Sequence, residues 1–222
     1  MRGDGHELQQ RSARVLPAEQ AAALATAGLT VRAVLATAGI RAGERVLVVG
    51  ATGGVGTTLV PLLAAAHATV VATATEHDAD LLRTLGAAEI IGYDERDYPA
   101  GVDAAFNLTL PSDRLTGVAR AVRPGGRLLT ITYPVPQQDR IARDDVDLRF
   151  VLDMEGTLGG MREVADLAAG GALRPTTGDS PSASTGGPLR ATIGRRYTLD
   201  EGAQACVDFE RRHTTGKLVV VM

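Results

Sequence analysis

The stretch Arg45–Gly56, RVLVVGATGGVG, constrains the fold more than any other part of this sequence. Its first half is a short apolar run rich in valine, which is typical of a buried β-strand. A glycine-rich turn follows at once, and the apolar residues after Gly56 continue for long enough to form a helix. The stretch therefore predicts a strand, a tight turn and a helix in direct succession.

The same alternation of short apolar runs and longer amphipathic stretches extends from Leu16 to Met154. This pattern is typical of βαβ units that form a parallel sheet. The predicted strands are Arg45–Val49, Thr69–Thr73, Glu89–Ile91, Ala104–Leu108, Arg127–Thr132 and Asp147–Leu152. The predicted helices are Ala18–Ala38, Val55–Ala66, Ala79–Leu85, Asp113–Val122 and Leu158–Ala169. The order predicts the α/β class: a Rossmann-type, doubly wound parallel sheet in a single domain with a C-terminal strand–helix appendage.

The sequence divides into four parts. Residues 1–15 form an N-terminal tail, and residues 16–175 form the predicted Rossmann domain. Residues 176–190 contain GDSPSASTGGP, whose glycine, serine and proline content predicts a flexible loop. Residues 191–222 form a strand–helix–strand segment, with a helix at Leu199–Arg212 and a last strand at Lys217–Val221.

Composition excludes several classes of function. The formal net charge is −3 and the basic residues are scattered, so the sequence shows no nucleic-acid footprint. The single cysteine, Cys206, excludes an internal disulfide and a multi-cysteine zinc site. The first ten residues lack the apolar core of a signal peptide. We also expect no apolar run as long as the roughly 20 residues that a membrane span needs. We therefore expect a cytoplasmic protein that does not bind a membrane.

The usual catalytic constellations are absent. The four histidines have no metal-ligand spacing, so we expect no metal site and place each histidine at the surface. The acidic stretch Asp144–Asp147 lies between Arg143 and Arg149 and is expected to be a solvated connection. Cys206 is expected to be a small buried residue on its helix rather than a nucleophile. No catalytic residue is assigned.

The glycine-rich turn points to phosphate binding. In a turn of this type the first small residue makes the bend, the second admits a pyrophosphate, and the third lets the helix pack on the strand. Ala51, Gly53 and Gly56 hold these three positions. The following helix directs its free N–H groups at the anion. The alternative is a turn that serves only the structure. The candidate dinucleotide contacts in the turn are Ala51, Thr52, Gly53, Gly54, Val55 and Gly56.

Several segments in the right order resemble the quinone oxidoreductase (zeta-crystallin-like) branch of the medium-chain dehydrogenase/reductases. They are ATGGVG, the preceding AAALATAGLTVRAVLATAGIRAGERVLV, LLRTLGAAEIIGYDERD, VRPGGRLLTI and TTGKLVVVM, and the resemblance runs from about Arg14 to Met222. It implies a zinc-independent protein in which the family's N-terminal GroES-like domain, which forms much of the substrate pocket, is absent from this sequence.

The cofactor choice depends on the end of the second strand. An acidic side chain about 20 residues beyond the turn normally holds the ribose 2′-hydroxyl of NAD, and Thr73 stands there. We therefore expect NADP, with NAD as the alternative. By resemblance, Thr75 and Tyr93 also contact the 2′-phosphate. Asp78 stands where many relatives place a lysine, and a carboxylate there opposes NADP unless it points into solvent.

The remaining candidate contacts follow from the resemblance and from the ends of the fourth and fifth strands, which meet at the crevice of such a sheet. They are Asn107, Leu108, Ile131, Thr132 and Tyr133. Ordinary strand-end packing is the alternative for each. Lys217 is a further candidate for the cofactor phosphates, with a solvated lysine as the alternative.

Two functions of different classes remain open. The first is NAD(P)H-dependent reduction of a quinone or an activated alkene, a small-molecule substrate, with the pocket completed by a homodimer partner or a separately encoded subunit. The apolar run Asp147–Leu152 would otherwise be a bare sheet edge, which favours the homodimer. The second is a cofactor-binding protein without redox turnover, such as a sensor, a scaffold or a remnant. A crevice reused for non-redox chemistry on a small apolar substrate lies between them.

Overall fold

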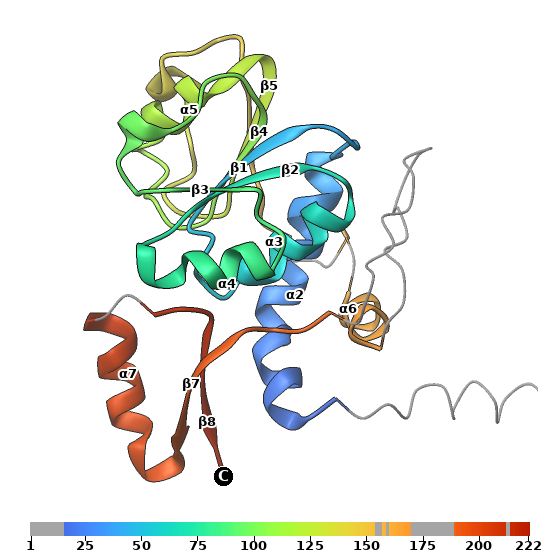
Figure 1. The fold of residues 1–222 in the computed structure, drawn as a ribbon, viewed down its shortest axis with the longest axis vertical. Coiled ribbons are helices and arrows are strands. Elements are labelled where there is room, and N and C mark those ends of the chain that lie inside the picture. The colour runs from blue at the N-terminus through green and yellow to red at the C-terminus, as the bar shows by residue number, and fades with distance from the viewer. Residues whose placement is uncertain (1–15, 154–156, 159, 170–188, 212–213) are drawn as a thin grey trace, which may run out of the picture.

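The computed structural model describes residues 16–153, 157–158, 160–169, 189–211 and 214–222. The expected tail at 1–15 and most of the expected loop at 176–190 lie outside these residues. Two units are seen in the described part: a six-stranded sheet flanked by helices, and a smaller lobe that contains the C-terminus (Figure 1).

The sheet is parallel throughout, and its strand order is β3-β2-β1-β4-β5-β6. This order is that of a doubly wound dinucleotide-binding sheet, so the predicted fold class is confirmed. The order reverses between β1 and β4, which pair in register from Val46 with Ala104 to Val49 with Asn107. The strands are β1 (Arg45–Val49), β2 (Thr69–Thr73), β3 (Glu89–Ile91), β4 (Val102–Asn107), β5 (Val122–Thr130) and β6 (Asp147–Phe150).

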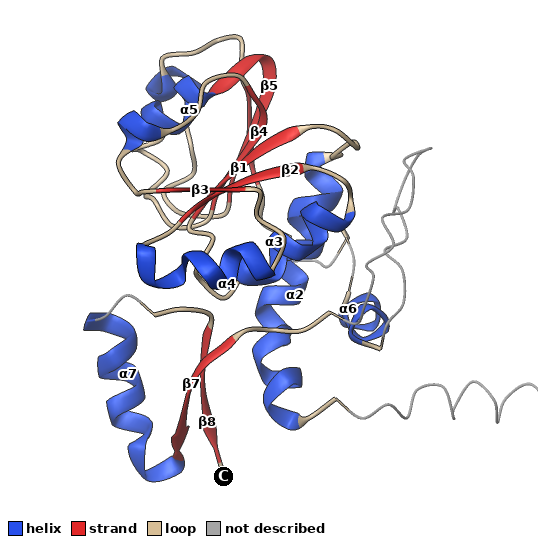
Figure 2. Ribbon diagram, in the orientation of Figure 1, coloured by secondary structure: helices blue, strands red, loops and turns tan. Residues whose placement is uncertain are grey.

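Alternate residues of the central strands enter two separate cores. In β1, Val46 and Val48 contact one cluster, while Leu47 and Val49 contact the other. Both faces of the strand are therefore buried, which explains why it is apolar without interruption. The first cluster includes residues of α2 (Ala18–Ala38), α3 (Gly56–Ala65), α4 (Ala79–Thr84) and α6 (Met161–Ala168), and the second includes α5 (Thr116–Ala121) (Figure 2).

The helix α2 corrects one expectation. It is 21 residues long with a mean hydropathy of 1.5 over its most apolar window, which is enough to cross a membrane by length and composition. The judgement that no apolar run approaches a membrane span was therefore wrong. Half of that window is buried inside the fold, where Leu24, Val31 and Val34 join the first core. A buried core helix of a soluble protein has these same features.

The element ends differ from the predicted ones mainly around β5. The strand was expected at Arg127–Thr132 but begins at Val122, which pairs with Val102 before the register shifts to Ala104 and Arg127. The residues of Pro124–Gly126 form a bulge there, since proline cannot donate to a ladder. β4 and β6 end one and two residues earlier than predicted, and α5 and α6 are shorter than predicted.

The C-terminal lobe has its own two-stranded sheet. β7 (Ile193–Thr198) and β8 (Lys217–Val221) pair in parallel, joined by a 3₁₀ turn at Leu199–Glu201 and α7 (Gly202–Arg211). In Figure 1 this lobe lies below α4, and the chain leading into β8 passes close to the main sheet domain. An isolated bridge between Gly53 and Gly216 joins the two units at the glycine-rich turn.

Candidate functional site

The glycine-rich turn lies at the carboxyl end of β1, next to the point where the strand order reverses. Gly50 makes the bend, because its φ of +87° lies in the region that favours glycine. Its amide donates to the Thr73 hydroxyl at 3.0 Å, which ties the turn to the end of β2. The sequence analysis assigned the bend to Ala51, and the structure moves this role one residue earlier.

The other two glycine positions have the expected geometry. A Cβ at Gly56 would lie 2.4 Å from the Gly50 oxygen and 2.5 Å from the Ala51 Cα, so only glycine lets α3 approach the strand so closely. A Cβ at Gly53 would meet only the Gly50 oxygen, at 3.5 Å. The space beside Gly53 is therefore open to a ligand. In α3 the amides of Thr57 and Leu59 already donate to the carbonyl oxygens of Gly53 and Val55, so an anion at this helix start would be met by amides earlier in the turn.

Thr73 does not face the crevice. Its side chain is fully buried, and its hydroxyl contacts the Gly50 amide and the Val48 carbonyl oxygen within the sheet. Thr73 therefore holds the turn in shape from below. The prediction that a cofactor ribose contacts this side chain is not supported by its direction.

Asp78 lies at the β2 side of the turn instead. Its residue is only 4% exposed, and each carboxylate oxygen accepts a hydrogen bond from a threonine hydroxyl. Thr75 donates at 3.2 Å from the loop after β2, and Thr215 donates at 2.6 Å from the C-terminal segment. The segment and the loop are thus joined by one buried acid.

Tyr93 and Thr52 complete this side of the site. The Tyr93 hydroxyl and the Thr52 hydroxyl lie 3.1 Å apart. Burial raises the pKa of Tyr93, the hydrogen bond with Thr52 lowers it, and the charge of Asp78 raises it further. Tyr93 is therefore a neutral donor at physiological pH, and it lies within the electrostatic reach of Asp78.

The C-terminal segment crosses the turn itself. The Gly216 amide donates to the Thr52 carbonyl oxygen at 2.7 Å, and a Cβ at Gly54 would meet the Lys217 side chain at 2.5 Å. Lys217 is the only lysine in the sequence. Its side chain passes beside the glycine-rich turn, where a phosphate would bind. The sequence analysis weighed Lys217 but missed Gly50, Thr215 and Gly216, and the run TTGK was the available signal.

The other half of the crevice carries a buried polar network. The Asn107 amide donates to the hydroxyls of Thr130, at 2.9 Å, and Thr132, at 3.0 Å. The Ser112 hydroxyl lies 2.9 Å from that of Thr130 and 3.0 Å from that of Thr132. Asn107 and Thr132, both predicted as ligand contacts, are thus brought together, and they hydrogen-bond to each other.

The remaining predicted residues of this half lie around that network. Leu108 and Ile131 are half-buried at the strand ends. Tyr133 is 61% exposed, and its ring meets that of Phe150 edge-on, with centroids 5.3 Å apart. These positions are compatible with contact to a ligand above β4 and β5, and the contacts themselves stay predictions.

A pocket of about 470 Å³ lies between the glycine-rich turn and the lobe. It is mainly apolar and contains Cys206, which is exposed, so the expectation that this residue is buried was wrong. The reason is that α7 buries only the face that carries Ala205 and Asp208, and Cys206 lies outside that face. Among the described residues no group of three or more potential metal ligands occurs. The pocket is lined by Gly53, Gly54, Gly202, Ala205, Cys206, Phe209, Thr214, Gly216, Lys217, Leu218 and Val220.

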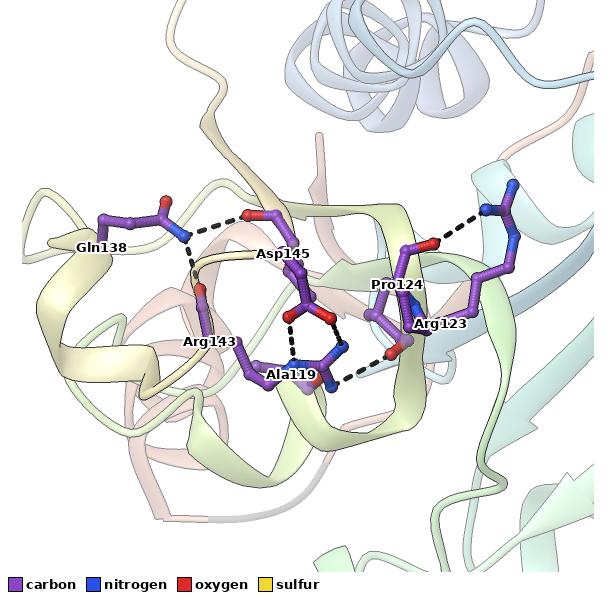
Figure 3. A network of polar contacts seen from close by, with 8 residues as sticks. Ala119, Arg123, Pro124, Gln138, Arg143 and Asp145 are labelled. Carbon is purple, nitrogen blue, oxygen red and sulfur yellow. Dashed lines mark hydrogen bonds and ion pairs between the residues drawn. The ribbon is translucent and has the colours of Figure 1, made fainter.

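The acidic stretch before β6 forms local ion pairs. Arg143 contacts both carboxylate oxygens of Asp145, at 2.5 and 2.8 Å, and also reaches the carbonyl oxygens of Ala119 and Val122 (Figure 3). The Arg143 hydrogen bond lowers the pKa of the exposed Asp145. These contacts pin the loop to α5, as expected of a solvated connection.

Among the curated proteins that align with the chain are one bacterial and one human protein, whereas no family model matches it. The spectinabilin polyketide synthase system protein NorB of Streptomyces orinoci is 35% identical over 141 residues, which are 59% of this chain and 6% of that protein. The human mitochondrial NAD(P)H oxidoreductase RTN4IP1 is 25% identical over 194 residues, 80% of this chain and 48% of that one. The chain therefore spans about half, or less, of the length of these relatives.

Solved structures share the fold over most of the chain. The quinone oxidoreductase of Thermus thermophilus, solved alone and with NADPH, has a TM-score of 0.70 and 28% identity, covering 94% of this chain and 68% of that one. Other neighbours include further quinone oxidoreductases and an enoyl reductase. The resemblance stated from the sequence, to quinone oxidoreductase-like proteins of the medium-chain dehydrogenase/reductase superfamily, is confirmed. The fold of the chain is thus the one these oxidoreductases share over most of its length.

Proposed function

We propose that the chain binds a nicotinamide dinucleotide at the glycine-rich turn and serves NAD(P)H-dependent reduction of a quinone or an activated alkene. The observation that carries the proposal is the geometry of the turn. Gly50 bends the chain, Gly56 lets α3 approach the strand, and the space beside Gly53 is open. The turn also lies where the strand order reverses, which is where such folds bind dinucleotides.

The residues present fit a dinucleotide. The pyrophosphate would lie at the start of α3 beside Gly53, with the Lys217 amine approaching from the C-terminal segment. The adenosine side would face Thr75, Asp78 and Tyr93, and the nicotinamide side would face the ends of β4 and β5. When bound, the nicotinamide supplies hydride to an electrophilic carbon of the substrate, and the protein contributes position and exclusion of water.

The relatives support this proposal through their printed names. NADPH is bound by the Thermus quinone oxidoreductase, and the human relative is an NAD(P)H oxidoreductase. Quinone and enoyl reduction both occur among the structural neighbours, so the acceptor is proposed as a class that includes quinones and conjugated alkenes. The dinucleotide is NADP, as the sequence predicts, or NAD, its alternative, and the two differ only in the 2′-phosphate on the adenosine ribose.

A second copy of the chain is proposed to complete the assembly. Within the described residues β6 pairs only with β5, so its outer edge is open. Tyr133, Val135 and Leu152 are exposed apolar side chains just beyond the ends of β5 and β6. We propose that the β6 edges of two copies associate, and a monomer at micromolar concentration in light scattering would contradict this. A separately encoded subunit over the substrate side is the alternative means of closing the site.

Cofactor binding without redox turnover is the second candidate function. The polar groups at the nicotinamide end, Asn107, Ser112, Thr130 and Thr132, hydrogen-bond to one another. Amide and hydroxyl side chains such as these are neutral and do not titrate near neutral pH, so this network supplies no general acid or base. If one face of the bound ring is also open to water, turnover on simple quinones will be weak. Reuse of the crevice for non-redox chemistry remains a further alternative.

The test is a calorimetric titration with NADH and NADPH. We expect Gly53→Val to abolish binding, because its side chain would fill the space beside the turn. Ala203→Val, on the exposed side of α7, adds a similar volume away from the site and should bind normally. Unchanged binding by Gly53→Val, in a variant with an unchanged melting temperature, would refute the site.

Turnover is measured separately by following the oxidation of the reduced dinucleotide with a simple quinone and with an α,β-unsaturated thioester. Oxidation at a rate well above the background supports the reductase. Binding without oxidation of either acceptor by the full chain in its native oligomeric state favours the second candidate.

A further inference from the structure

The acid on the adenosine side of the site is Asp78. Thr215 donates to Asp78, and the next residue, Gly216, donates to the carbonyl oxygen of Thr52 in the glycine-rich turn. Because consecutive Cα atoms are about 3.8 Å apart, this chain of contacts brings the Asp78 carboxylate next to the turn. Asp78 also follows β2 by only a few residues. It therefore lies where the adenosine ribose of a bound dinucleotide would be.

The position of the Asp78 carboxylate is fixed. The residue is 4% exposed, and hydroxyl donors from two segments far apart in the chain, Thr75 and Thr215, hold one oxygen each. An exposed acid at this place would turn into solvent and be screened. A buried acid in a fixed position keeps its field at the site, where the effective dielectric constant is lower than in water.

Acidic side chains outnumber basic ones in the two segments that follow β2 and β3. Glu76 and Asp80 lie on the same loop and helix start, and Asp94, Glu95 and Asp97 follow β3. The nearby arginines bond to neighbouring acids: Arg83 to Asp80, and Arg96 to Asp94. His77 is exposed, and the Lys217 stem passes over Gly54, on the pyrophosphate side of the turn. The described residues of these two segments therefore carry a net negative charge.

We infer that Asp78, fixed by Thr75 and Thr215, selects the cofactor by rejecting a ribose 2′-phosphate and tolerating a 2′-hydroxyl, so that the chain binds NADH more tightly than NADPH. The inference rests on the proposed function and refines it. It revises the expectation from Thr73, because that hydroxyl bonds within the sheet whereas Asp78 supplies the acid from a later position. The Tyr93 hydroxyl, a neutral donor beside Thr52, can serve the ribose without adding positive charge.

The first experiment compares two pairs of ligands by calorimetry: NADH with NADPH, and AMP with adenosine 2′,5′-bisphosphate. The second pair lacks the nicotinamide and therefore reports the adenosine side alone. We expect the ligand without the 2′-phosphate to bind roughly tenfold more tightly in each pair, the scale of one partly shielded charge contact. Asp78→Asn keeps the shape and removes the charge, so it should bring the two affinities within about threefold by strengthening the 2′-phosphate ligands.

Asp80→Asn is the matched control. It removes the same charge two residues later, from a side chain that is 97% exposed. Because water and salt screen this charge, we expect the ratio of affinities to change by less than about twofold. An equal effect of the two variants would show that only the overall charge matters and would refute a specific role for Asp78.

The second experiment tests the hydrogen bond by which Thr215 holds Asp78. Thr215→Val removes the hydroxyl that donates to Asp78 but keeps the size of the side chain, and we expect it to reduce the preference for NADH by about threefold. Thr214→Val is its control, since the Thr214 hydroxyl makes no hydrogen bond to the described residues. A Thr215→Val variant that loses affinity for both dinucleotides equally, with the same ratio, would make Thr215 structural only.

The outcomes separate the two proposals. Tighter binding of NADPH than NADH by the wild type refutes the role of Asp78 and leaves the proposed function intact. Failure of both dinucleotides and both adenosine nucleotides to bind at millimolar concentration refutes the proposed function and this inference with it. An NADH preference that Asp78→Asn removes and Asp80→Asn keeps supports both.

Discussion

The six-stranded sheet and the C-terminal lobe are both built on parallel strands, yet they bury their side chains very differently. In β1 every residue after Arg45 is buried, and in β4 only Asp103 is not. In β7 only Tyr197 is buried, and in β8 only Val219. Since stability follows the apolar area removed from water, most of it must come from the main sheet.

The lobe depends on polar contacts instead. Asp208 is buried and accepts hydrogen bonds from Tyr197, Arg195 and Gln204 within the lobe. The lobe joins the main domain at the candidate site through Thr215 and Gly216. It also joins it at α2 and the first core, where Arg196 pairs with Glu19 and Val219 is buried. The difference indicates that the sheet provides most of the apolar core, whereas the lobe has little core of its own and contacts the candidate site directly.

The largest expected effect compares two phenylalanines. Phe106 in β4 is fully buried, so Phe106→Ala should lower the free energy of unfolding by about 3–5 kcal/mol through lost burial and a cavity. Phe209 in α7 is 73% exposed, and Phe209→Ala should change it by less than about 0.5 kcal/mol. Urea unfolding monitored by far-UV circular dichroism measures both. Similar losses in the two variants would show that the lobe is as tightly packed as the sheet.

Two glycines give the next comparison. A Cβ at Gly56 would lie 2.4–2.5 Å from backbone atoms of Gly50 and Ala51, so Gly56→Ala should destabilise the sheet domain by about 1–3 kcal/mol. A Cβ at Gly202, at the start of α7, meets no atom within 4 Å. Gly202→Ala should therefore change the melting temperature little. A stable Gly56→Ala variant would mean that α3 can move away from β1 without cost.

Removing one hydroxyl in the lobe should have a smaller and local effect. Tyr197→Phe deletes the 2.9 Å hydrogen bond to Asp208, at a cost of about 1 kcal/mol. We expect hydrogen exchange to become faster at the amides of β7 and β8 and to stay unchanged in β1 and β4. Equal acceleration in both sheets would show that the lobe and the main domain unfold as one cooperative unit, against the comparison above.

The sequence predicted the sheet better than the site, for physical reasons. Short runs rich in valine and isoleucine, separated by turn residues and helical stretches, favour strands, and β1, β2 and β3 were predicted with the bounds they have. The bulge at Pro124–Gly126 depends on pairing with β4 and moved the start of β5.

In the site, local chemistry was predictable and long-range contacts were not. The glycine-rich turn was found from its pattern, although Gly50 rather than Ala51 makes the bend. The bond from Thr215 to Asp78 joins residues 137 positions apart, and no local pattern indicates such a contact. The exposure of Cys206 likewise follows from how the lobe packs, which composition does not determine.

The smallest expected effect is a pH dependence that separates the two units. At the amino edge of the main sheet, Arg123 donates to Asp103 at 2.6 Å and the Arg45 amide donates at 2.8 Å. The Arg123 bond is the largest cause of the lowered pKa of Asp103; burial opposes it, and the hydrogen bond from the Arg45 amide lowers the pKa further. A lowered pKa means that this contribution to stability is present above the unfolded pKa of about 3.9 and is lost as the pH falls through the folded value.

Because the Arg123 side chain is 45% exposed, solvent screens the pair and the contribution is below about 1 kcal/mol. Asp103→Asn should therefore reduce the loss of unfolding free energy as the pH falls, measured by global unfolding between about pH 6 and pH 3. In the lobe, hydrogen bonds from the Thr198 amide and hydroxyl lower the pKa of the exposed Glu201. Glu201→Gln should leave the pH dependence of the global unfolding free energy unchanged and alter only the amide hydrogen exchange of β7 and β8. If Glu201→Gln changed the pH dependence of the global unfolding free energy, the lobe would limit the stability of the whole chain despite its sparse packing.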